Sequence, residues 1–309
     1  MNTFGNNAVK PPKKKMSRQR RSDMIWGYIC VAPLTIGLLL FLAAPLCFAL
    51  YLSLTQYDLF NEPVFVGFDN FIRAFSANET QFWPSVGNAF VMSIGVLLSM
   101  ACSLVLANLI SGKRKGSNVF RMIYFLPTIC SSVAVGIMWK RIYDYQYGFI
   151  NNIVALFGGD KVNWLDAAHA VPSIIFLNVL FGMGTNILLY IATIKNVPAS
   201  YYEAAELDGA GSLQKFFYIT LPSVSPVSFY ILTTGLIGSL QGFAIYQVMT
   251  NGSPSNTMMP MLIIYNYMGG NYGAFYGYAS SLAILLGVII AIVTALNFGI
   301  SKKWVYYES

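Results

Sequence analysis

The chain has 309 residues, of which 56% are hydrophobic and only 10% are charged. Soluble domains are about 45–50% apolar and about 25% charged, so this composition argues against a soluble globular domain and excludes intrinsic disorder. Lys and Arg outnumber Asp and Glu by 19 to 12, and the positions of these charges decide whether the net charge of +7 serves a nucleic acid or a membrane surface.

Six apolar segments are long enough to cross a bilayer as helices, which takes about 20 residues. They are approximately residues 25–54, 86–111, 119–140, 171–194, 224–248 and 278–301. The first segment far exceeds the apolar core of a cleaved signal peptide, which is about 7–15 residues long. The sequence therefore predicts an all-α membrane protein with a six-helix domain over residues 25–301, a basic tail over residues 1–24 and a short C-terminal segment over residues 302–309.

The lysines and arginines are distributed unevenly between the loops. Most of them lie in the N-terminal tail, in the loops after the second and fourth segments, and at the C-terminus, which all fall on one side. Loops rich in Lys and Arg stay in the cytoplasm, so we expect both termini to be cytoplasmic. The basic tail, with Lys13, Lys14 and Lys15 among its charges, is then expected to bind anionic lipid and not nucleic acid.

Residue patterns for catalysis or metal binding are lacking in the sequence. The cysteines lie in apolar runs without a C-x-x-C pair, and His169 is the single histidine. We therefore predict no metal site, no catalytic residues and no enzymatic activity. The six segments are almost free of ionisable side chains, with Arg121 and Lys140 at the two ends of the third. Ion-driven transporters use such groups inside the membrane, so energy for uphill transport would enter from outside the membrane.

The cytoplasmic loop over residues 195–223 has helix signals at both ends. Ser200 and Glu203 match a capping box that would begin a helix, and Gly209 and Gly211 would end it. Ser212 could cap a second short helix, which we expect to end before Pro222. The pattern predicts a helical hairpin that docks a partner, or alternatively an interfacial helix without one.

The same loop carries a recognisable motif. Glu203-Ala204-Ala205, Asp208-Gly209-Ala210, Phe216, Ile219 and Leu221-Pro222 match the pattern E-A-A-x2-D-G-A-x5-F-x2-I-x-L-P at every fixed position. The chain therefore resembles the ABC importer permeases. Asn163-Trp164-Leu165 and Trp304-Val305-Tyr306-Tyr307-Glu308 resemble the carbohydrate branch of that family, which includes the maltose and glycerol-phosphate permeases.

This resemblance implies a type I ABC importer permease fold and a set of partners. These would be a second homologous permease, two ATPase subunits that bind ATP and Mg, and an extracytoplasmic solute-binding protein that delivers a carbohydrate. The location would be the bacterial cytoplasmic (inner) membrane, as a multi-pass protein. The helix near Tyr201 would be the coupling helix that contacts one ATPase, through Tyr201, Tyr202, Glu203, Ala204, Ala205, Leu207, Asp208, Gly209 and Ala210. The chain itself has no phosphate-binding loop, so no cofactor is expected on it.

Neutral sugars are recognised by amide, hydroxyl and aromatic side chains. The candidates for a solute pathway within the spans are Asn178, Thr185, Asn186, Tyr190, Thr234, Ser239, Gln241 and Tyr246. For each of them, hydrogen bonding between helices is an open alternative. Gly235, Gly238 and Gly242 fit either a pathway or close helix packing.

The third outer loop, over residues 249–277, contains no charged residue. Its segment 252–257 resembles the family's Gly-Gly-Pro loop that faces the binding protein, with Ser253 in place of the second Gly. The candidate contact residues are Asn251, Gly252, Pro254, Asn256 and Thr257.

The sequence thus predicts the permease subunit of an ATP-driven sugar importer, which forms half of the translocation pathway and takes an oligosaccharide as its cargo. Two alternatives stay open at this point. One is the same architecture with a phosphorylated polyol or a peptide as the solute, although the spans lack central cations for an anion. The other is a channel or carrier that works without partners.

Overall fold

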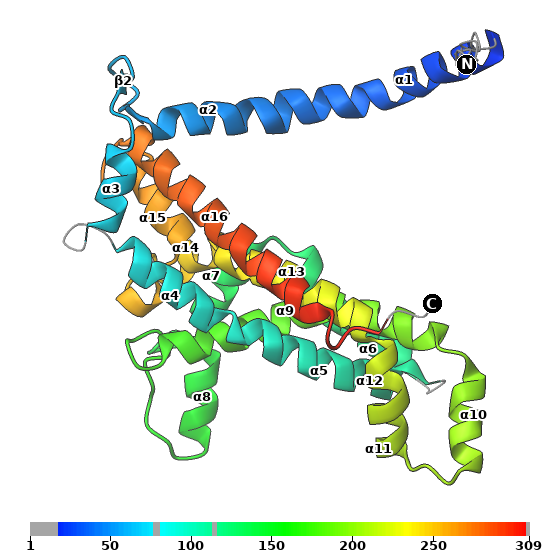
Figure 1. Cartoon of the computed structure of the whole chain (residues 1–309). Coiled ribbons are helices and arrows are strands. Elements are labelled where there is room, and N and C mark those ends of the chain that lie inside the picture. Colours follow the sequence, from blue (N-terminus) through cyan, green and yellow to red (C-terminus); the bar gives the residue numbers. More distant parts are fainter. Residues whose placement is uncertain (1–17, 77–80, 113–115, 307–309) are drawn as a thin grey trace, which may run out of the picture. The chain divides into compact units, whose positions relative to one another are not determined.

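The computed structural model describes residues 18–76, 81–112 and 116–306. Most of the predicted basic tail, the loop cations Lys113, Arg114 and Lys115, and the last three residues lie outside this range. The chain divides into two compact units, Met1–Tyr51 and Leu52–Ser309. In the first unit, α1 (Arg18–Leu38) continues through a π-helical turn, η1 (Leu39–Ala43), into α2 (Ala44–Ser53), whose last two residues belong to the second unit (Figure 1).

The second unit is almost entirely helical. It begins with a small antiparallel hairpin in which β1 (Thr55–Gln56) pairs with β2 (Val64–Phe65). The helices that follow are α3 (Asp69–Phe75), α4 (Phe82–Met92), α5 (Ile94–Ser111), α6 (Ser117–Ile129), α7 (Ser132–Ile142), α8 (Phe149–Leu156), α9 (Ala170–Asn196), α10 (Ala199–Leu207), α11 (Ser212–Lys215), η2 (Phe216–Thr220), α12 (Leu221–Ser223), α13 (Ser225–Leu240), α14 (Ala244–Met249), η3 (Ser255–Thr257), α15 (Pro260–Tyr267) and α16 (Tyr276–Ser301).

Four helical runs are long and apolar enough to cross a membrane, and the number rises to six if each of two bent pairs counts as one span. The four runs are Met24–Ser53, Phe82–Ser111, Ala170–Asn196 and Tyr276–Ser301. They cover the first, second, fourth and sixth predicted segments. The predicted all-α membrane fold is therefore confirmed.

The third predicted segment, residues 119–140, is not one straight helix. It consists of α6 and α7, which meet at an angle of 103°. Pro127 in the last turn of α6 has no backbone N–H to continue the helix, and Cys130 and Ser131 adopt extended conformations before α7 begins. Hydropathy predicts an apolar segment of this length, but it does not predict that the helix bends within it.

The fifth predicted segment, residues 224–248, is also divided. α13 ends at Leu240, and the short α14 begins only at Ala244 after a turn that contains Gly242. On the other side of α13, the helical run Ser212–Ser223 meets it at 64°. This run passes through Pro222, where we had predicted an end. The π turn η2 lies directly before Pro222, and the wider turn accommodates a residue that cannot donate the usual helical hydrogen bond.

Small residues let the spans of the second unit pack closely. A side chain on Gly95 of α5 would contact Ile175 of α9, and one on Gly184 of α9 would clash with the backbone of α6 at Tyr124. Close approach at small residues is the usual way in which helices associate in a membrane. α9 therefore lies between α5 and α6, and the large buried side chains Ile174, Leu177 and Ile187 fill the space around it.

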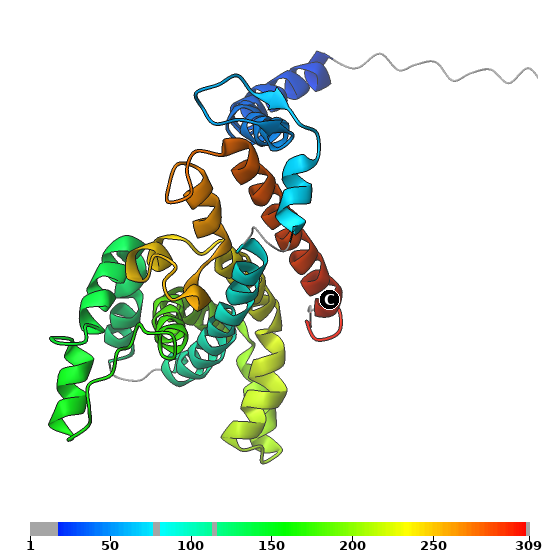
Figure 2. The ribbon, with the colours of Figure 1, turned by 90° about the vertical axis from the view of Figure 1, so that its left-hand side faces the viewer.

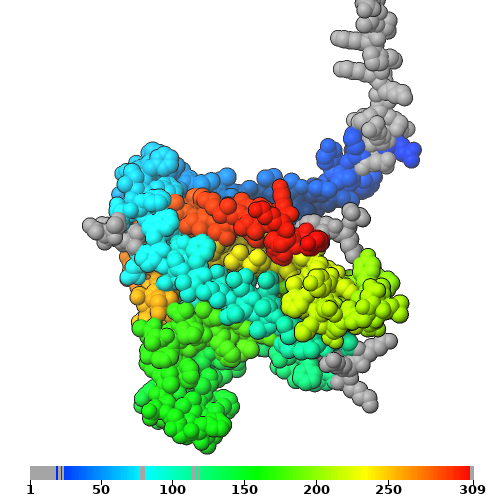
Figure 3. All heavy atoms as spheres, turned by 60° about the horizontal axis from the view of Figure 1, so that its bottom comes forward, coloured from blue at the N-terminus to red at the C-terminus, as the bar shows by residue number. Residues whose placement is uncertain are grey.

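The helical hairpin α10–α12 and the loop that contains α8 lie at opposite ends of this unit (Figures 1 and 3). α8 runs across the direction of α5 and α9, which Figure 2 shows with α9 nearly end-on and α8 in the plane of the view. The β-hairpin and α3 lie at the same end as α8. The sequence predicts that the end with the hairpin is cytoplasmic and that the end with α8 is the outer one.

Candidate functional site

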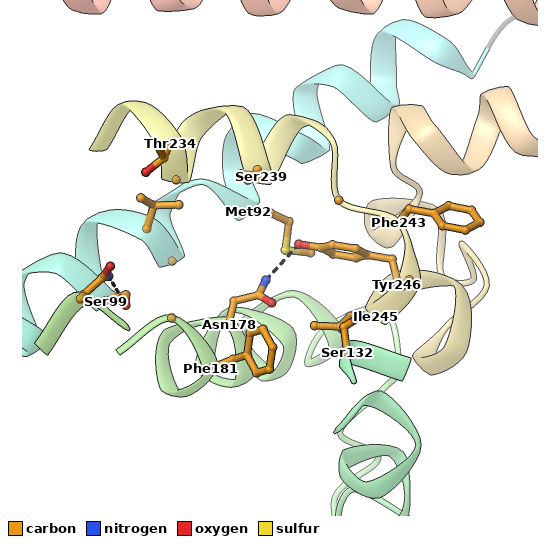
Figure 4. A pocket seen from close by; sticks show the side chains of 18 of the residues that line it. Met92, Ser99, Ser132, Asn178, Phe181, Thr234, Ser239, Phe243, Ile245 and Tyr246 are labelled. Atoms are coloured by element: carbon orange, nitrogen blue, oxygen red, sulfur yellow. Dashed lines mark hydrogen bonds between the residues drawn. The ribbon is translucent and has the colours of Figure 1, made fainter. Parts of the chain in front are cut away.

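A cavity of about 450 Å³ lies between the spans of the second unit. Its walls come from α4, α5, α7, α9, α13 and α14 (Figure 4). The polar side chains at its walls are Ser99, Ser132, Asn178, Asn186, Thr234, Ser239 and Tyr246. Among the described residues that line the cavity, none is charged.

Five of the eight predicted pathway residues line this cavity: Asn178, Asn186, Thr234, Ser239 and Tyr246. The other three lie elsewhere. Tyr190 is completely buried, and its hydroxyl is 3.0 Å from that of Ser228, so it joins α9 to α13. Thr185 is exposed on α9, and Gln241 is exposed at the end of α13, away from the cavity lining.

The lining side chains are held by a small number of hydrogen bonds. The Asn178 amide donates to the Tyr246 phenol oxygen at 3.0 Å, and the Asn186 amide donates to the Ser99 hydroxyl at 3.3 Å. Ser239 donates to the Ala89 carbonyl at 3.2 Å. Buried polar groups in a bilayer need such partners. Three of the predicted pathway residues, Asn178, Asn186 and Ser239, therefore also form the bonds between helices that the sequence left open as an alternative.

Several lining residues were missed by sequence analysis. Ser99 and Ser132 are common helix residues in apolar runs, and nothing in their spacing distinguishes them. Phe181 lies beside the Asn178 amide, whereas the Phe243 ring points away from it and packs against Tyr265, with the ring centres 5.2 Å apart (Figure 4). Since Phe181 lies three residues after the candidate Asn178 on the same helix, a search for aromatic residues one turn away would have found it.

The three glycines of the fifth segment have different roles. A side chain on Gly235 would overlap Val96 of α5, which makes this glycine a packing residue. A side chain on Gly238 would meet nothing within 4 Å, because this position opens into the cavity. At Gly242 the Tyr246 ring lies 2.7 Å from the position of an added Cβ, so this glycine makes room for the phenol.

The predicted helical hairpin is present as α10, a turn and α11. The turn is made at Gly209, whose φ of +78° favours glycine, and the Ala210 N–H donates to the Ala205 carbonyl at 2.8 Å to close the end of α10. The predicted caps are wrong in detail. Pro198 and not Ser200 precedes α10, which shows no side-chain capping bond, and Gly211 precedes α11 with its N–H bonded to the Gln214 side chain at 2.7 Å.

The hairpin presents only part of the predicted contact set to its surroundings. Its exposed members are Tyr201, Glu203, Ala204, Leu207, Asp208 and Gly209, and Leu207 is 90% exposed. Tyr202, Ala205 and Ala210 are half-buried. The Tyr202 hydroxyl is 3.0 Å from that of Thr220, so this residue connects α10 to η2 instead of facing outward.

An ion pair between two residues at variable positions of the motif also stabilises this hairpin. The Lys215 amine lies 2.7 Å from the Glu206 carboxylate, across the Gly209 turn. The hydrogen bond and the charge of Lys215 hold the pKa of Glu206 below its usual value. α10 is therefore joined to the second arm of the hairpin at two points, to α11 by Glu206–Lys215 and to η2 by Tyr202–Thr220.

The segment 251–257 is tightly built. Gly252 has a φ of +77° and is buried against Met258, and Thr257 is completely buried with its hydroxyl 3.0 Å from that of Thr250. Asn256 donates to the Ala167 carbonyl at 2.7 Å. Gly252 and Thr257 therefore shape the loop from within, whereas Asn251 is exposed and Pro254 and Asn256 are partly exposed.

A second hollow, of about 460 Å³, lies between the β-hairpin, α3 and the start of α16. Asp58, Glu62 and Asp69 line it, together with Arg73, whose guanidinium lies 4.5 Å from the centre of the Tyr278 ring. Hydrogen bonds from Asn61, led by its backbone N–H, lower the pKa of Asp58. Within the described part of the chain, no group of three or more His, Cys, Asp or Glu side chains is arranged to hold a metal ion.

Comparison with known proteins assigns the architecture. Residues 94–305 match the family described as "Binding-protein-dependent transport system inner membrane component". The probable ABC transporter permease protein YesP of Bacillus subtilis (strain 168) is 35% identical over 302 residues, which cover 96% of each chain. The arabinooligosaccharides transport system permease protein AraP of the same organism is 31% identical and covers 90% of this chain and 88% of its own length.

A solved structure also matches this fold. It is a bacterial alginate ABC transporter in complex with an alginate pentasaccharide-bound periplasmic protein. One of its chains superposes with a TM-score of 0.79 and 23% identity, and the match covers 93% of this chain and 96% of that one. At this level of identity the likeness shows a shared fold.

Proposed function

The chain belongs to the family of binding-protein-dependent transport system inner membrane components, and on this premise we propose that it is the permease subunit of an ATP-driven sugar importer. It would form half of the translocation pathway in a bacterial cytoplasmic membrane, with both termini in the cytoplasm. An oligosaccharide is the proposed cargo. The family is one of transport components and not of enzymes.

The cavity is the observation that carries this proposal. Its walls combine two amides, four hydroxyls and a phenol with the ring of Phe181, and its described lining has no charge. Amides and hydroxyls satisfy sugar hydroxyls in both directions, because each sugar hydroxyl donates and accepts. Aromatic faces cover the apolar faces of a sugar ring. The volume of about 450 Å³ is within the range of small-molecule sites.

The cytoplasmic hairpin supports coupling to an ATPase. It protrudes from the other helices of the second unit, and it exposes Leu207 and Asp208 near its turn and Glu203 one turn earlier on α10. An apolar side chain that is 90% exposed on a braced hairpin suits insertion into a partner's cleft. We propose that two ATPase subunits, carrying ATP and Mg, serve this chain and a second homologous permease.

The opposite end supports delivery by a solute-binding protein. Asn251, Pro254 and Asn256 reach the surface there, and the acids Asp58, Glu62 and Asp69 surround the second hollow. The solved alginate ABC transporter that shares this fold is in complex with a periplasmic protein that carries an alginate pentasaccharide. We propose that a binding protein for this chain docks over the same loops.

A phosphorylated polyol or a peptide is the alternative cargo. A phosphate would call for Arg or Lys within reach, and the cavity's described lining supplies none. Lys140, one of the cations at the ends of the bent pair α6–α7, donates to the Val248 carbonyl at 3.0 Å. The geometry therefore favours a neutral sugar, and a channel that works without partners would leave the coupling hairpin without a role.

The test is co-purification followed by a substrate screen. A tag at Ser309 would recover the complex from native membranes in mild detergent, and we expect a second permease and two copies of a soluble ATPase. The reconstituted complex, with its binding protein, should show ATP hydrolysis that neutral oligosaccharides stimulate. A chain that purifies alone and conducts solute passively would contradict the proposal. If only a polyol phosphate stimulated ATP hydrolysis, the proposed oligosaccharide substrate would be wrong and the polyol phosphate would take its place.

A further inference from the structure

Helix α8 carries an apolar stripe on its exposed side. Phe149, Ile153, Leu156 and Phe157 follow the spacing i, i+4, i+7 and i+8, which places them along one face of the helix. Leu156 and Phe157 are 84% and 86% exposed, and Phe149 is 64% exposed. Large apolar side chains that gather on one exposed face mark a contact with a partner or a membrane.

The other side of α8 is fixed to the body of the protein. Asn151 is completely buried, and its carboxamide oxygen accepts hydrogen bonds from the Val162 N–H at 3.1 Å and the Trp164 indole at 3.0 Å. Its amide donates to the Val162 carbonyl at 2.9 Å and the Tyr145 carbonyl at 3.1 Å. Ile150 packs against the main apolar core. The stripe is thus held outward by the fold.

The chemistry around the stripe suits a phospholipid surface. Residues 145–159 contain no charged side chain, and they include the exposed aromatics Tyr145 and Tyr147. Tyr and Trp side chains gather at membrane–water boundaries because one end is apolar and the other is polar. Charged residues lie only at the two ends of this stretch, with Arg141 and Asp144 before it and Asp160 and Lys161 after it.

The position of α8 also fits the boundary of a bilayer. Only six residues separate it from the end of α7, whose last turn carries Lys140 and Arg141, cations of the kind that mark the headgroup level. α7 itself exposes the apolar side chains Val133, Ile137 and Met138. α8 runs across the direction of α5 and α9 at the end opposite the coupling hairpin, as a helix lying in the membrane plane would (Figures 1 and 2).

We propose that α8 is an interfacial anchor whose Phe149, Ile153, Leu156 and Phe157 enter the outer leaflet of the phospholipid bilayer. The anchor holds the loop 143–169 at a fixed distance from the bilayer surface. That loop supports the neighbouring outer segment through Asn256, which donates to the Ala167 carbonyl at 2.7 Å. Lipid contact at α8 thereby positions the segment 251–257.

The test places a fluorescent bimane label on α8 in the assembled complex. The four native cysteines are first replaced by alanine, and the single substitution Leu156→Cys puts the label on the stripe. Ala155→Cys is the matched control, because Ala155 is exposed and points about 100° around the helix axis from Leu156, away from the stripe. The complex is reconstituted into vesicles of phosphatidylethanolamine and phosphatidylglycerol, with either doxyl-labelled phospholipid or aqueous iodide as the quencher.

We expect the label at 156 to lose fluorescence with doxyl lipid and to be protected from iodide, and the label at 155 to show the reverse. Quenching of the 156 label by iodide alone would overturn the proposal in favour of a water-exposed helix. Protection from both quenchers, relieved when the partner subunits are stripped away, would overturn it in favour of a protein contact. Phe149→Cys provides a second label on the stripe if the first variant assembles poorly.

Discussion

The amide of Asn178 donates a hydrogen bond to the phenol oxygen of Tyr246 at 3.0 Å, and this bond joins α9 to α14 at the wall of the cavity (Figure 4). The two residues are 68 positions apart in the sequence. They belong to the fourth predicted segment and to the short helix that the fifth one becomes after its break. The break at residues 241–243 is therefore what brings the phenol to face the amide.

The first prediction concerns this phenol. Tyr246→Phe removes only the hydroxyl, and a neutral hydrogen bond contributes about 0.5–1.5 kcal/mol, so we expect the KM for sugar uptake to rise about 2- to 10-fold. Tyr190→Phe is the matched control, since its hydroxyl bonds to Ser228 away from the cavity. Uptake by reconstituted vesicles measures both. An equal rise in KM for the two variants would remove Tyr246 from the solute path.

The second prediction separates two glycines one turn apart. Gly235→Ala puts a methyl group into Val96, and overpacking of this kind costs about 1–3 kcal/mol, so the variant should unfold at a lower temperature in detergent. Gly238→Ala has open space, so its thermal midpoint should stay unchanged while its methyl group narrows the cavity and lowers uptake of larger sugars. A lower thermal midpoint for Gly238→Ala, with an unchanged midpoint for Gly235→Ala, would contradict the assignment of Gly238 to the cavity and of Gly235 to helix packing.

The third prediction concerns the exposed face of the α10–α11 hairpin, which we propose contacts an ATPase. Glu203→Ala should reduce the amount of ATPase that co-purifies and lower transport, because it removes an exposed carboxylate from the proposed contact, while membrane insertion stays normal. Asp160→Ala removes an exposed carboxylate at the opposite end and should retain the full complement of ATPase. Normal ATPase recovery and transport in the Glu203 variant would count against the coupling role.

The fourth prediction concerns the brace between α10 and α11. Glu206→Lys places two cations at 206 and 215 and should lower sugar-stimulated ATP hydrolysis, and the double variant Glu206→Lys/Lys215→Glu should restore it. Because the pKa of Glu206 is lowered in the folded protein, the pair contributes at neutral pH and is lost only as the pH falls through that lowered value. The activity loss should therefore be constant between about pH 6 and pH 8. Failure of the double variant to recover would show that the two side chains do not act as a pair.

Apolar length and local motifs predicted much of this architecture. The four unbroken spans follow from apolar runs of sufficient length, and Gly209 follows from the need for a positive φ after α10. The amides Asn178 and Asn186 were predictable because polar side chains in apolar segments require partners. Each of these features depends on residues that are close in the sequence, so it can be recognised before the fold is known.

The remaining features depend on contacts between distant segments. The bends at residues 130–131 and 241–243 lie within continuous apolar runs, where hydropathy gives no direction. Ser99 enters the cavity because Asn186 of another helix approaches it. Tyr202 turns inward because Thr220 is available to it, although the motif places it beside exposed residues. These bends and side-chain orientations are determined by contacts between distant segments, and a single sequence does not reveal those contacts.

The last prediction tests the buried amide that holds α8. Asn151→Ala would leave the Val162 N–H and the Trp164 indole N–H without their acceptor, and each unsatisfied buried group costs about 1–3 kcal/mol. We expect a lower thermal midpoint and faster proteolysis within the loop 143–169. Asn152→Ala is the matched control, because the neighbouring Asn152 side chain is exposed and should leave both measurements unchanged. Equal behaviour of the two variants would mean that Asn151 does not fix the loop, and the outward orientation of the stripe on α8 would then need another cause.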